Sequence, residues 1–272
     1  MSNFSSFFRF NARFTVLVSL FLTTYIVAAQ TFQHQYGTAF NNAFSKIYQS
    51  GTNYYVVGSD QGTQGGPALA SVSYLNANGV IQWTRRLNIN SLWQDAVVTP
   101  NGSLFVVGQT LPSDANAQSI MGVIQSNGSF AWVNSYNTTG RDGFSRVVRN
   151  PSPQSASNPY YVLGYQFDPS GNAQWDDVVL LTVSETGSIG WKRRIENASD
   201  DEFARNLTAL PNGDLILAGN RGANGVVLRF NNAGVYQNGA SPEGFSFAFN
   251  HVSRRSSGGF YAVGQTFPGG TA

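Results

Sequence analysis

The sequence predicts an all-β fold, a β-propeller of four-stranded antiparallel blades, and three observations support this prediction. The chain of 272 residues contains 29 glycines and 14% aromatic residues but only 11% charged residues, a balance typical of short strands joined by tight turns. A unit of about fifty residues recurs along it, which is the period of a propeller blade. Each unit contains short apolar or alternating runs bounded by Gly, Asn and Pro, which favours strands over helices.

Two sequence anchors define the repeat. The first is a strand that ends in glycine, and its five copies end at Gly58, Gly108, Gly164, Gly219 and Gly264. These glycines are 50, 56, 55 and 45 residues apart. The second anchor is a turn glycine followed four positions later by tryptophan, with copies at Gly79/Trp83, Gly128/Trp132 and Gly187/Trp191 and a degenerate copy at Gly234/Asn238. The two anchors keep the same phase, which argues against chance.

Each unit is expected to form four strands. In the second unit these are 96–99, 104–107, 120–124 and 130–136. A four-stranded blade cannot bury both faces alone, so successive blades should stack face to face. The repeated tryptophans are therefore expected between the sheets, as core contacts and not as platforms for a cofactor.

The two ends of the chain predict partial blades around four complete ones. The segment Phe32–Tyr36 resembles Trp132–Tyr136, so it is expected to be the last strand of an incomplete blade. Pairing of this strand with the C-terminal repeat would close the ring and remove its exposed edges. The fifth repeat stops soon after Gly264, before its third strand. We expect a C-terminally incomplete fragment of a larger ring; five blades lacking one closing strand are the alternative.

The N-terminus has the pattern of a secretory signal peptide over residues 1–29. Arg9 and Arg13 precede an apolar run from Phe14 to Ala28, and Val27-Ala28-Ala29 provides small residues for cleavage before Gln30. The run is shorter than the roughly 20 residues of a membrane-spanning helix. The sequence thus predicts cleavage, a mature propeller domain over residues 30–272, no membrane span after cleavage, and a secreted or cell-surface location.

The composition argues against several functions. Without Arg9 and Arg13 the chain has 14 basic and 14 acidic residues, so a nucleic-acid partner is not expected. The absence of cysteine removes thiolate metal sites and cysteine nucleophiles. The two histidines, His34 and His251, are far apart in sequence, so a histidine metal centre or a Ser-His-Asp triad is not expected.

The repeat resembles a family of secreted bacterial propellers. Its elements are an apolar strand, an Asn-Gly turn as in Pro100-Asn101-Gly102, a strand ending in glycine, and the Gly-x-x-x-Trp turn. These repeats are often found ahead of a type IX secretion sorting domain, and the resemblance covers most of residues 32–272. It implies an extracellular location but no specific activity. No sorting domain is visible, and residues 150–158 and 167–175 read as insertions. The strand-turn-Trp pattern also looks like pyrroloquinoline-quinone propellers, although their calcium and cofactor ligands are not matched as a set.

The longer connections form the candidate binding face. In a blade whose strands run outward from the axis, the connections between strands one and two and between three and four lie on one face, and they are short here. The other connections are longer and variable, and binding residues concentrate on such loops. They also hold 12 of the 14 acidic residues. The ligand-binding candidates are Trp93, Asp95, Arg141, Asp142, Trp175, Asp200, Asp201 and Glu202.

One segment has oxygen side chains at alternate positions, as calcium loops do. Its candidate metal ligands are Asp168, Ser170, Asn172, Asp176 and Asp177. It lacks the Gly and Glu positions of the helical calcium loop, so an ordinary polar turn is the alternative. The chain is therefore expected to be a binding, adhesion or scaffold module for a protein or glycan. A secreted hydrolase or quinoprotein-like enzyme, using acidic loops or the central channel, is the alternative function.

Overall fold

The computed structural model describes Tyr36 and residues 42–111, 116–137, 140–152, 157–167, 176–195, 202–222, 224–241 and 247–266. These residues form strands β1 to β17 and no α-helix. Every paired set of strands is antiparallel. A helix with the length and apolar character needed to cross a membrane is not found in the described part of the chain.

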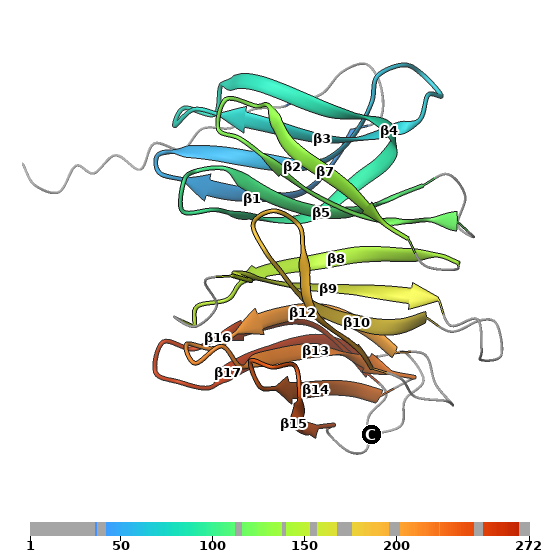
Figure 1. The fold of residues 1–272 in the computed structure, drawn as a ribbon, viewed down its shortest axis with the longest axis vertical. Helices are drawn as coiled ribbons and strands as arrows, with labels where there is room; N and C mark the ends of the chain where they lie inside the picture. The colour runs from blue at the N-terminus through green and yellow to red at the C-terminus, as the bar shows by residue number, and fades with distance from the viewer. Residues whose placement is uncertain are drawn as a thin grey trace, which may run out of the picture. The chain divides into compact units, whose positions relative to one another are not determined.

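The strands form four complete blades and a two-stranded fifth sheet, which confirms the predicted architecture (Figure 1). The first and second blades share one strand, β4. They comprise β1 (Asn42–Ser50), β2 (Asn53–Gln61), β3 (Ala68–Leu75), β4 (Ile81–Val98), β5 (Leu104–Thr110), β6 (Ser119–Ile124) and β7 (Phe130–Tyr136). The third comprises β8 (Asp142–Arg149), β9 (Tyr160–Phe167), β10 (Asp176–Val183) and β11 (Ile189–Ile195). The fourth comprises β12 (Glu202–Ala209), β13 (Leu215–Arg221), β14 (Asn224–Phe230) and β15 (Tyr236–Ala240), and the fifth sheet β16 (Phe247–Arg254) and β17 (Phe260–Thr266).

The inner strand of the second blade was expected at residues 96–99, after a longer connection, but β4 runs without a break from Ile81 to Val98. Its first part pairs with β3 as the outer strand of the first blade, and its last part pairs with β5 as the inner strand of the second. At the crossover, the backbone N–H of Leu111 donates to the backbone carbonyl of Asn90 at 2.9 Å. The side-chain amide of Asn90 donates in return to the carbonyl of Leu111 at 2.7 Å. Asn90 is still paired with Leu69 of β3, and Ser91 is already paired with Thr110 of β5, so the chain stays extended as β4 passes from one blade to the next.

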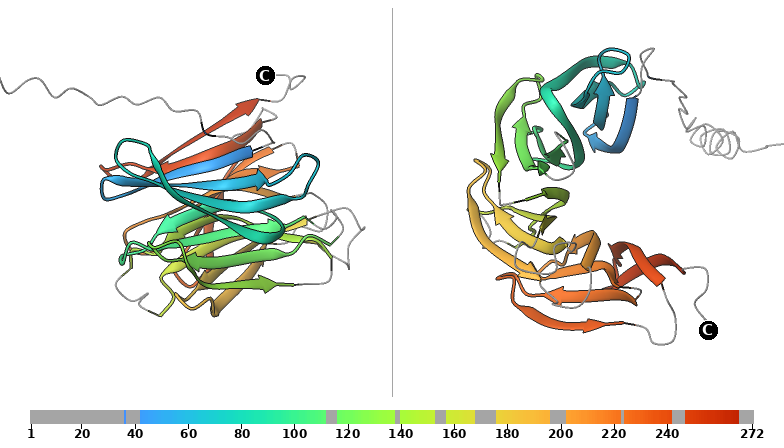
Figure 2. Two further views of the ribbon diagram at one scale, coloured as in Figure 1. Left: turned by 90° about the horizontal axis from the view of Figure 1, so that it is seen from above. Right: turned by 90° about the vertical axis from the view of Figure 1, so that its right-hand side faces the viewer.

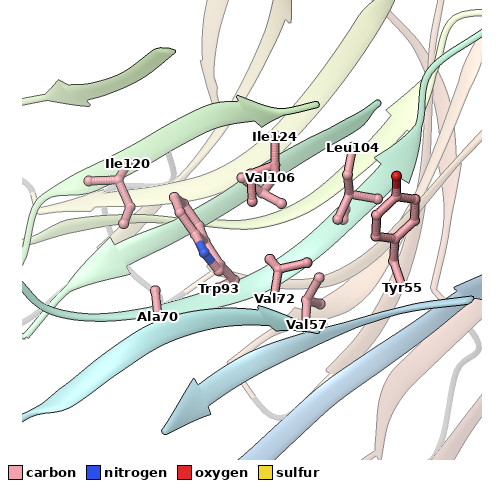
Figure 3. Close-up of a cluster of buried hydrophobic side chains, with 10 residues drawn as sticks. Tyr55, Val57, Ala70, Val72, Trp93, Leu104, Val106, Ile120 and Ile124 are labelled. Atoms are coloured by element: carbon pink, nitrogen blue, oxygen red, sulfur yellow. The ribbon is translucent and has the colours of Figure 1, made fainter. Parts of the chain in front are cut away.

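Successive sheets are stacked face to face (Figure 2). Buried apolar side chains fill the space between them. Between the first two blades, Tyr55 and Val57 of β2 meet Trp93 of β4 and Val106 of β5 in one buried cluster (Figure 3). The equivalent clusters between the later blades also contain buried side chains from the second strand of each blade, which is β5, β9 or β13. Removal of these side chains from water is the main stabilising contribution that one blade can offer the next.

The repeated tryptophans connect neighbouring blades, as the sequence predicts. Trp83, Trp132 and Trp191 each lie against the turn glycine of the following blade. A Cβ added at Gly128, Gly187 or Gly234 would lie 3.0, 2.8 or 2.6 Å from the respective indole ring. These glycines have φ of 86°, 85° and 71°, a backbone conformation that other residues rarely adopt. The turn glycine of each Gly-x-x-x-Trp anchor thus packs against the tryptophan of the preceding blade. The tryptophan of the same anchor packs against the turn glycine of the following blade.

The predicted N-terminal strand lies outside the described residues except for its last residue. The hydroxyl of Tyr36 donates to the carbonyl of Gly79. Tyr136, which ends β7, makes the equivalent bond to the carbonyl of Gly187 at 2.6 Å. Both acceptors are turn glycines of the second anchor, so Tyr36 has the same partner type that the alignment of Phe32–Tyr36 with Trp132–Tyr136 implies.

The fifth sheet exposes positions that are buried in every complete blade. Tyr261 and Val263 are 60% and 59% exposed. Their equivalents, counted back from the strand-ending glycines, are at most 1% exposed: Tyr55 and Val57, Phe105 and Val107, Tyr161 and Leu163, and Ile216 and Ala218. No following sheet covers this face within the described residues.

Candidate functional site

A groove between the second and third blades is the candidate binding site. Its cavity of about 300 Å³ lies between β7 and the third sheet, next to the ends of the longer connections. Phe144, Val179 and Leu181 form an apolar floor. Ile189 lies at the rim, where 40% of it is exposed. An apolar recess with polar groups at its edge is the common form of a recognition pocket.

Two charged side chains with different environments lie at this groove. Asp142, at the start of β8, is only 2% exposed and accepts a hydrogen bond from the backbone N–H of Ser119. Lys192 of β11 lies at the exposed rim and donates to the side-chain oxygen of Gln166 at 2.6 Å. Partial burial lowers the pKa of Lys192, while the nearby Asp142 charge acts in the opposite direction. The groove therefore presents one anchored carboxylate and one cation.

The tyrosines of the groove are held by hydrogen bonds to neighbouring elements. The hydroxyl of Tyr165 donates to the side-chain oxygen of Gln109 at 2.7 Å, which ties β9 to β5. The hydroxyl of Tyr136 donates to the carbonyl of Gly187, and burial raises the pKa of Tyr136, so this donor stays protonated at neutral pH. Such pre-formed side-chain positions reduce the ordering cost of binding.

The groove contains one of the sequence-predicted site residues, Asp142. Arg141 is the adjacent residue, and its carbonyl accepts a hydrogen bond from the backbone N–H of Phe167 at 2.8 Å. Asp142 is the one carboxylate among the described lining residues. Hydrolysis by paired carboxylates needs two facing acids, so this lining suits recognition better than that chemistry.

Trp93 and Asp95 lie inside the protein and not on a loop. Trp93 is fully buried in the first inter-blade cluster (Figure 3). Asp95 is 3% exposed and pairs with the ammonium of Lys46 at 2.7 Å. The reason is that β4 continues through the region expected to be a connection. These two side chains therefore act in packing and in the joining of blades.

The calcium segment is described only at its end. Asp168, Ser170 and Asn172 lie outside the described residues, and Asp176 is described only as a backbone position in β10. Asp177 is 5% exposed and pairs with Arg194 of β11. The described residues contain no group of three or more His, Asp or Glu side chains placed to hold a metal ion.

The remaining candidates are also largely outside the described residues. Trp175, Asp200 and Asp201 are not described, and Glu202 is described only as the first backbone position of β12. Two described carboxylates beside the longer connections are paired with cations: Asp60 with Arg86 and Asp177 with Arg194. Charge counting along the sequence misses this pairing because the partners come from different strands.

Sequence reasoning did not single out Tyr136, Lys192 and Ile189. These three residues lie in strands, whereas binding residues were expected on the longer connections. The sequence around Ile189 gave no distinguishing signal, because an apolar residue follows the turn glycine by two positions in each blade, as Ile81, Phe130 and Tyr236 show.

Four-stranded antiparallel sheets, repeated in one register and stacked through equivalent side chains, define the chain as a β-propeller protein with an inter-blade groove. No protein-family model matches the chain, and no curated protein matches its sequence.

Solved structures support the fold. A protein of unknown function from Bacteroides caccae is 12% identical, with a TM-score of 0.52 over 82% of this chain and 70% of that one. The WD40 domain of Neurospora crassa Pan2 is 14% identical, with a TM-score of 0.46 over 78% of this chain and 69% of that one. An acylaminoacyl peptidase from Pyrococcus horikoshii is 7% identical, with a TM-score of 0.44 over 77% and 33% of the two chains. The first likeness agrees with the fold, and none of the three identifies an activity.

Proposed function

We propose that this propeller is a secreted or cell-surface binding module that recognises a peptide segment in the groove between its second and third blades. The observation that carries the proposal is the apolar recess of about 300 Å³ with Asp142 and Lys192 at its polar edge. The resemblance to secreted bacterial propeller repeats and the signal-peptide pattern of residues 1–29 support the extracellular location.

The dimensions and chemistry of the groove favour a peptide. Its volume is at the low end of the roughly 300–1,000 Å³ of small-molecule sites, which suits one apolar side chain on the floor of Phe144, Val179 and Leu181. Gln166, Asn137 and Lys192 at the edge can bond to backbone carbonyl and N–H groups that flank such a side chain. The acidic cluster of Asp200, Asp201 and Glu202 follows β11 in the next long connection, and we include it in the proposed binding face.

Substitution of Ile189 by aspartate should abolish peptide binding without unfolding the protein. A charge at this rim would oppose burial of an apolar side chain, and the expected loss of affinity is at least about tenfold. Ile81 provides a matched control, because it occupies the same position of the first blade and is also 40% exposed, but does not line the groove. The measurement is selection of a displayed peptide library on the wild type, followed by calorimetric titration of the enriched peptides into I189D and I81D.

Enriched peptides should share one apolar or aromatic residue and should bind I81D as tightly as wild type. Failure to enrich any peptide, or equal binding to I189D, would contradict the groove as a peptide site.

Export should yield a protein that begins at Gln30. The physical basis is the small-residue boundary Val27-Ala28-Ala29 after the apolar run. N-terminal sequencing of protein recovered from the medium or the cell surface tests this directly. Recovery of the same protein beginning at Met1 would refute cleavage, and replacement of Ala29 by a bulky residue should shift or block processing in the expected case.

A further inference from the structure

Two cavities occupy homologous positions on the other side of the blades, where the short turns lie. One, of about 250 Å³, is bounded by Thr99, Val123 and Trp132 of the second blade and by Glu185 and Thr186 in a turn of the third. The other, of about 270 Å³, is bounded by Asn150, Thr182 and Trp191 of the third blade and by Asn232 and Ala233 in the equivalent turn of the fourth. The repeat has therefore produced the same cavity twice.

In the first blade an aromatic ring occupies the equivalent position. Tyr74 lies directly across from Trp83 in the pairing of β3 with β4, and its ring stacks on the indole at 5.5 Å with 20° between the planes. Val123 lies across from Trp132 in the same register. The side-chain oxygen of Thr182 accepts a hydrogen bond from the backbone N–H of Trp191 at 3.0 Å, which places it at the equivalent position. Because valine and threonine are smaller than tyrosine, a space about the size of an aromatic ring remains beside Trp132 and Trp191.

The cavity linings combine apolar surface with polar groups and are almost uncharged. Among the described lining residues Glu185 alone carries a charge, and amides and hydroxyls supply the other polar groups. Amides and hydroxyls offer both donors and acceptors. The indole N–H groups are already bonded, to the carbonyl of Glu185 at 3.0 Å and to that of Asn232 at 3.3 Å. The tryptophans therefore contribute ring surface, and the amides and hydroxyls contribute hydrogen bonds.

Tyr160 adds a buried hydroxyl that has no hydrogen-bond partner among the residues that the structure describes. It is 1% exposed, lines the first cavity, and stacks on Phe105 at 4.3 Å. The equivalent residues of the second and fourth blades are Leu104 and Leu215, both fully buried. An unpartnered buried hydroxyl destabilises the fold, and leucine at this position avoids this loss. Burial raises the pKa of Tyr160 to about 12, so the hydroxyl is an available donor at neutral pH.

We propose that each of these two cavities binds one neutral pyranose ring of a sugar. The face of a pyranose that presents its C–H groups can lie against the indole of Trp132 or Trp191, as the ring of Tyr74 lies against Trp83. Its hydroxyls can bond to the amide and hydroxyl side chains, and to Tyr160 in the first cavity. This combination of an aromatic wall with convergent neutral polar groups suits a polyhydroxylated ligand better than an ion or an apolar one. The inference does not depend on the peptide groove, with which neither cavity shares a lining residue.

The test follows the indole N–H signals of the tryptophans by nuclear magnetic resonance during titration with methyl pyranosides of neutral hexoses and N-acetylhexosamines. We expect one glycoside to shift the signals of Trp132 and Trp191 with millimolar affinity and to leave Trp83 and Trp93 unchanged. Val123→Tyr rebuilds the stack of the first blade in the first cavity, so it should remove the shift at Trp132 and retain the shift at Trp191. Tyr160→Phe should weaken binding at the Trp132 site alone, by about fivefold, which corresponds to one neutral hydrogen bond.

Three results would overturn the proposal: no indole shift with any glycoside up to tens of millimolar, shifts of equal size at Trp83, or an unchanged Trp132 response in V123Y. If V123Y does not fold, Y160F decides the question, because loss of one hydroxyl leaves the packing against Phe105 intact. Equal affinity of the wild type and Y160F at the Trp132 site would then contradict the assigned donor.

Discussion

Replacement of Asp95 by alanine should destabilise the protein by about 3 kcal/mol, within the range for breaking a buried ion pair. Asp95 of the second blade joins three blades. Its carboxylate accepts hydrogen bonds from the ammonium of Lys46 at 2.7 Å and the hydroxyl of Tyr48, both in the first blade. It also accepts from the backbone N–H of Val147 in the third blade at 3.0 Å. Alanine would leave a buried N–H without its acceptor and remove the charge that faces Lys46.

The control for this substitution is Asp60→Ala. Asp60 pairs with Arg86, but both belong to the first blade and Arg86 is 40% exposed, so the expected loss is about 1 kcal/mol or less. Asp95→Asn should cost nearly as much as D95A, because it loses the charge and replaces one of the two accepting oxygens with an NH2 group that faces another donor. Urea unfolding measures all three. Equal losses for D95A and D60A would show that the link between blades adds no stability.

Replacement of Gly108 by alanine should have an effect of similar size, about 3 kcal/mol or more. Gly108 ends the repeated strand of the second blade and lies opposite Trp93, where a β-bulge in β4 shifts the pairing register. A Cβ at Gly108 would lie 2.0 Å from the carbonyl oxygen of Leu92. That neighbour is backbone and cannot rotate away, so the inner and second strands of the blade must separate locally.

Gly62 is the matched control for the glycine substitution. It has no atom within 4 Å of an added Cβ, so G62A should change the melting temperature little. Gly58 and Gly264 meet the same 2.0 Å contact as Gly108 in their own blades, and G58A should repeat the large loss. A melting temperature for G108A close to that of G62A would contradict the proposed steric role of the strand-ending glycine.

The repeat, the number of complete blades and the strand order could be predicted from the amino-acid sequence. The reason is that each blade repeats the same local requirements. The strand-ending glycines at Gly58, Gly108, Gly164 and Gly264 are required where the bulge of the inner strand brings a carbonyl against the second strand. The turn glycines need positive φ. Such requirements depend on neighbours in the same blade or the next one, so they recur with the period of the chain.

The position of Trp93 and Asp95 in an inner strand could have been predicted by aligning them with the inner strands of the other blades. Phe44, Trp93, Phe144 and Phe249 all lie opposite a strand-ending glycine, each followed by a bulge. Trp93-Gln94-Asp95 is thus a copy of Phe44-Ser45-Lys46, which belongs to an inner strand. The asparagines and serine before Trp93 look like a loop, but the bonds between Asn90 and Leu111 keep that segment extended.

The side chains that meet between blades could not be predicted in this way, because their contacts form only when the sheets stack. The groove joins Asp142 to Lys192 of the same sheet and to Tyr136 of the preceding one, and Asp95 pairs with Lys46 across 49 residues. The difference between Tyr74, which fills its position, and Val123 and Thr182, which leave cavities, likewise depends on the turn that the next blade brings against each tryptophan. Local sequence sets the shape of a blade, whereas a site between blades depends on the volume and charge of side chains that come from two blades, and this sum is fixed only when the sheets stack.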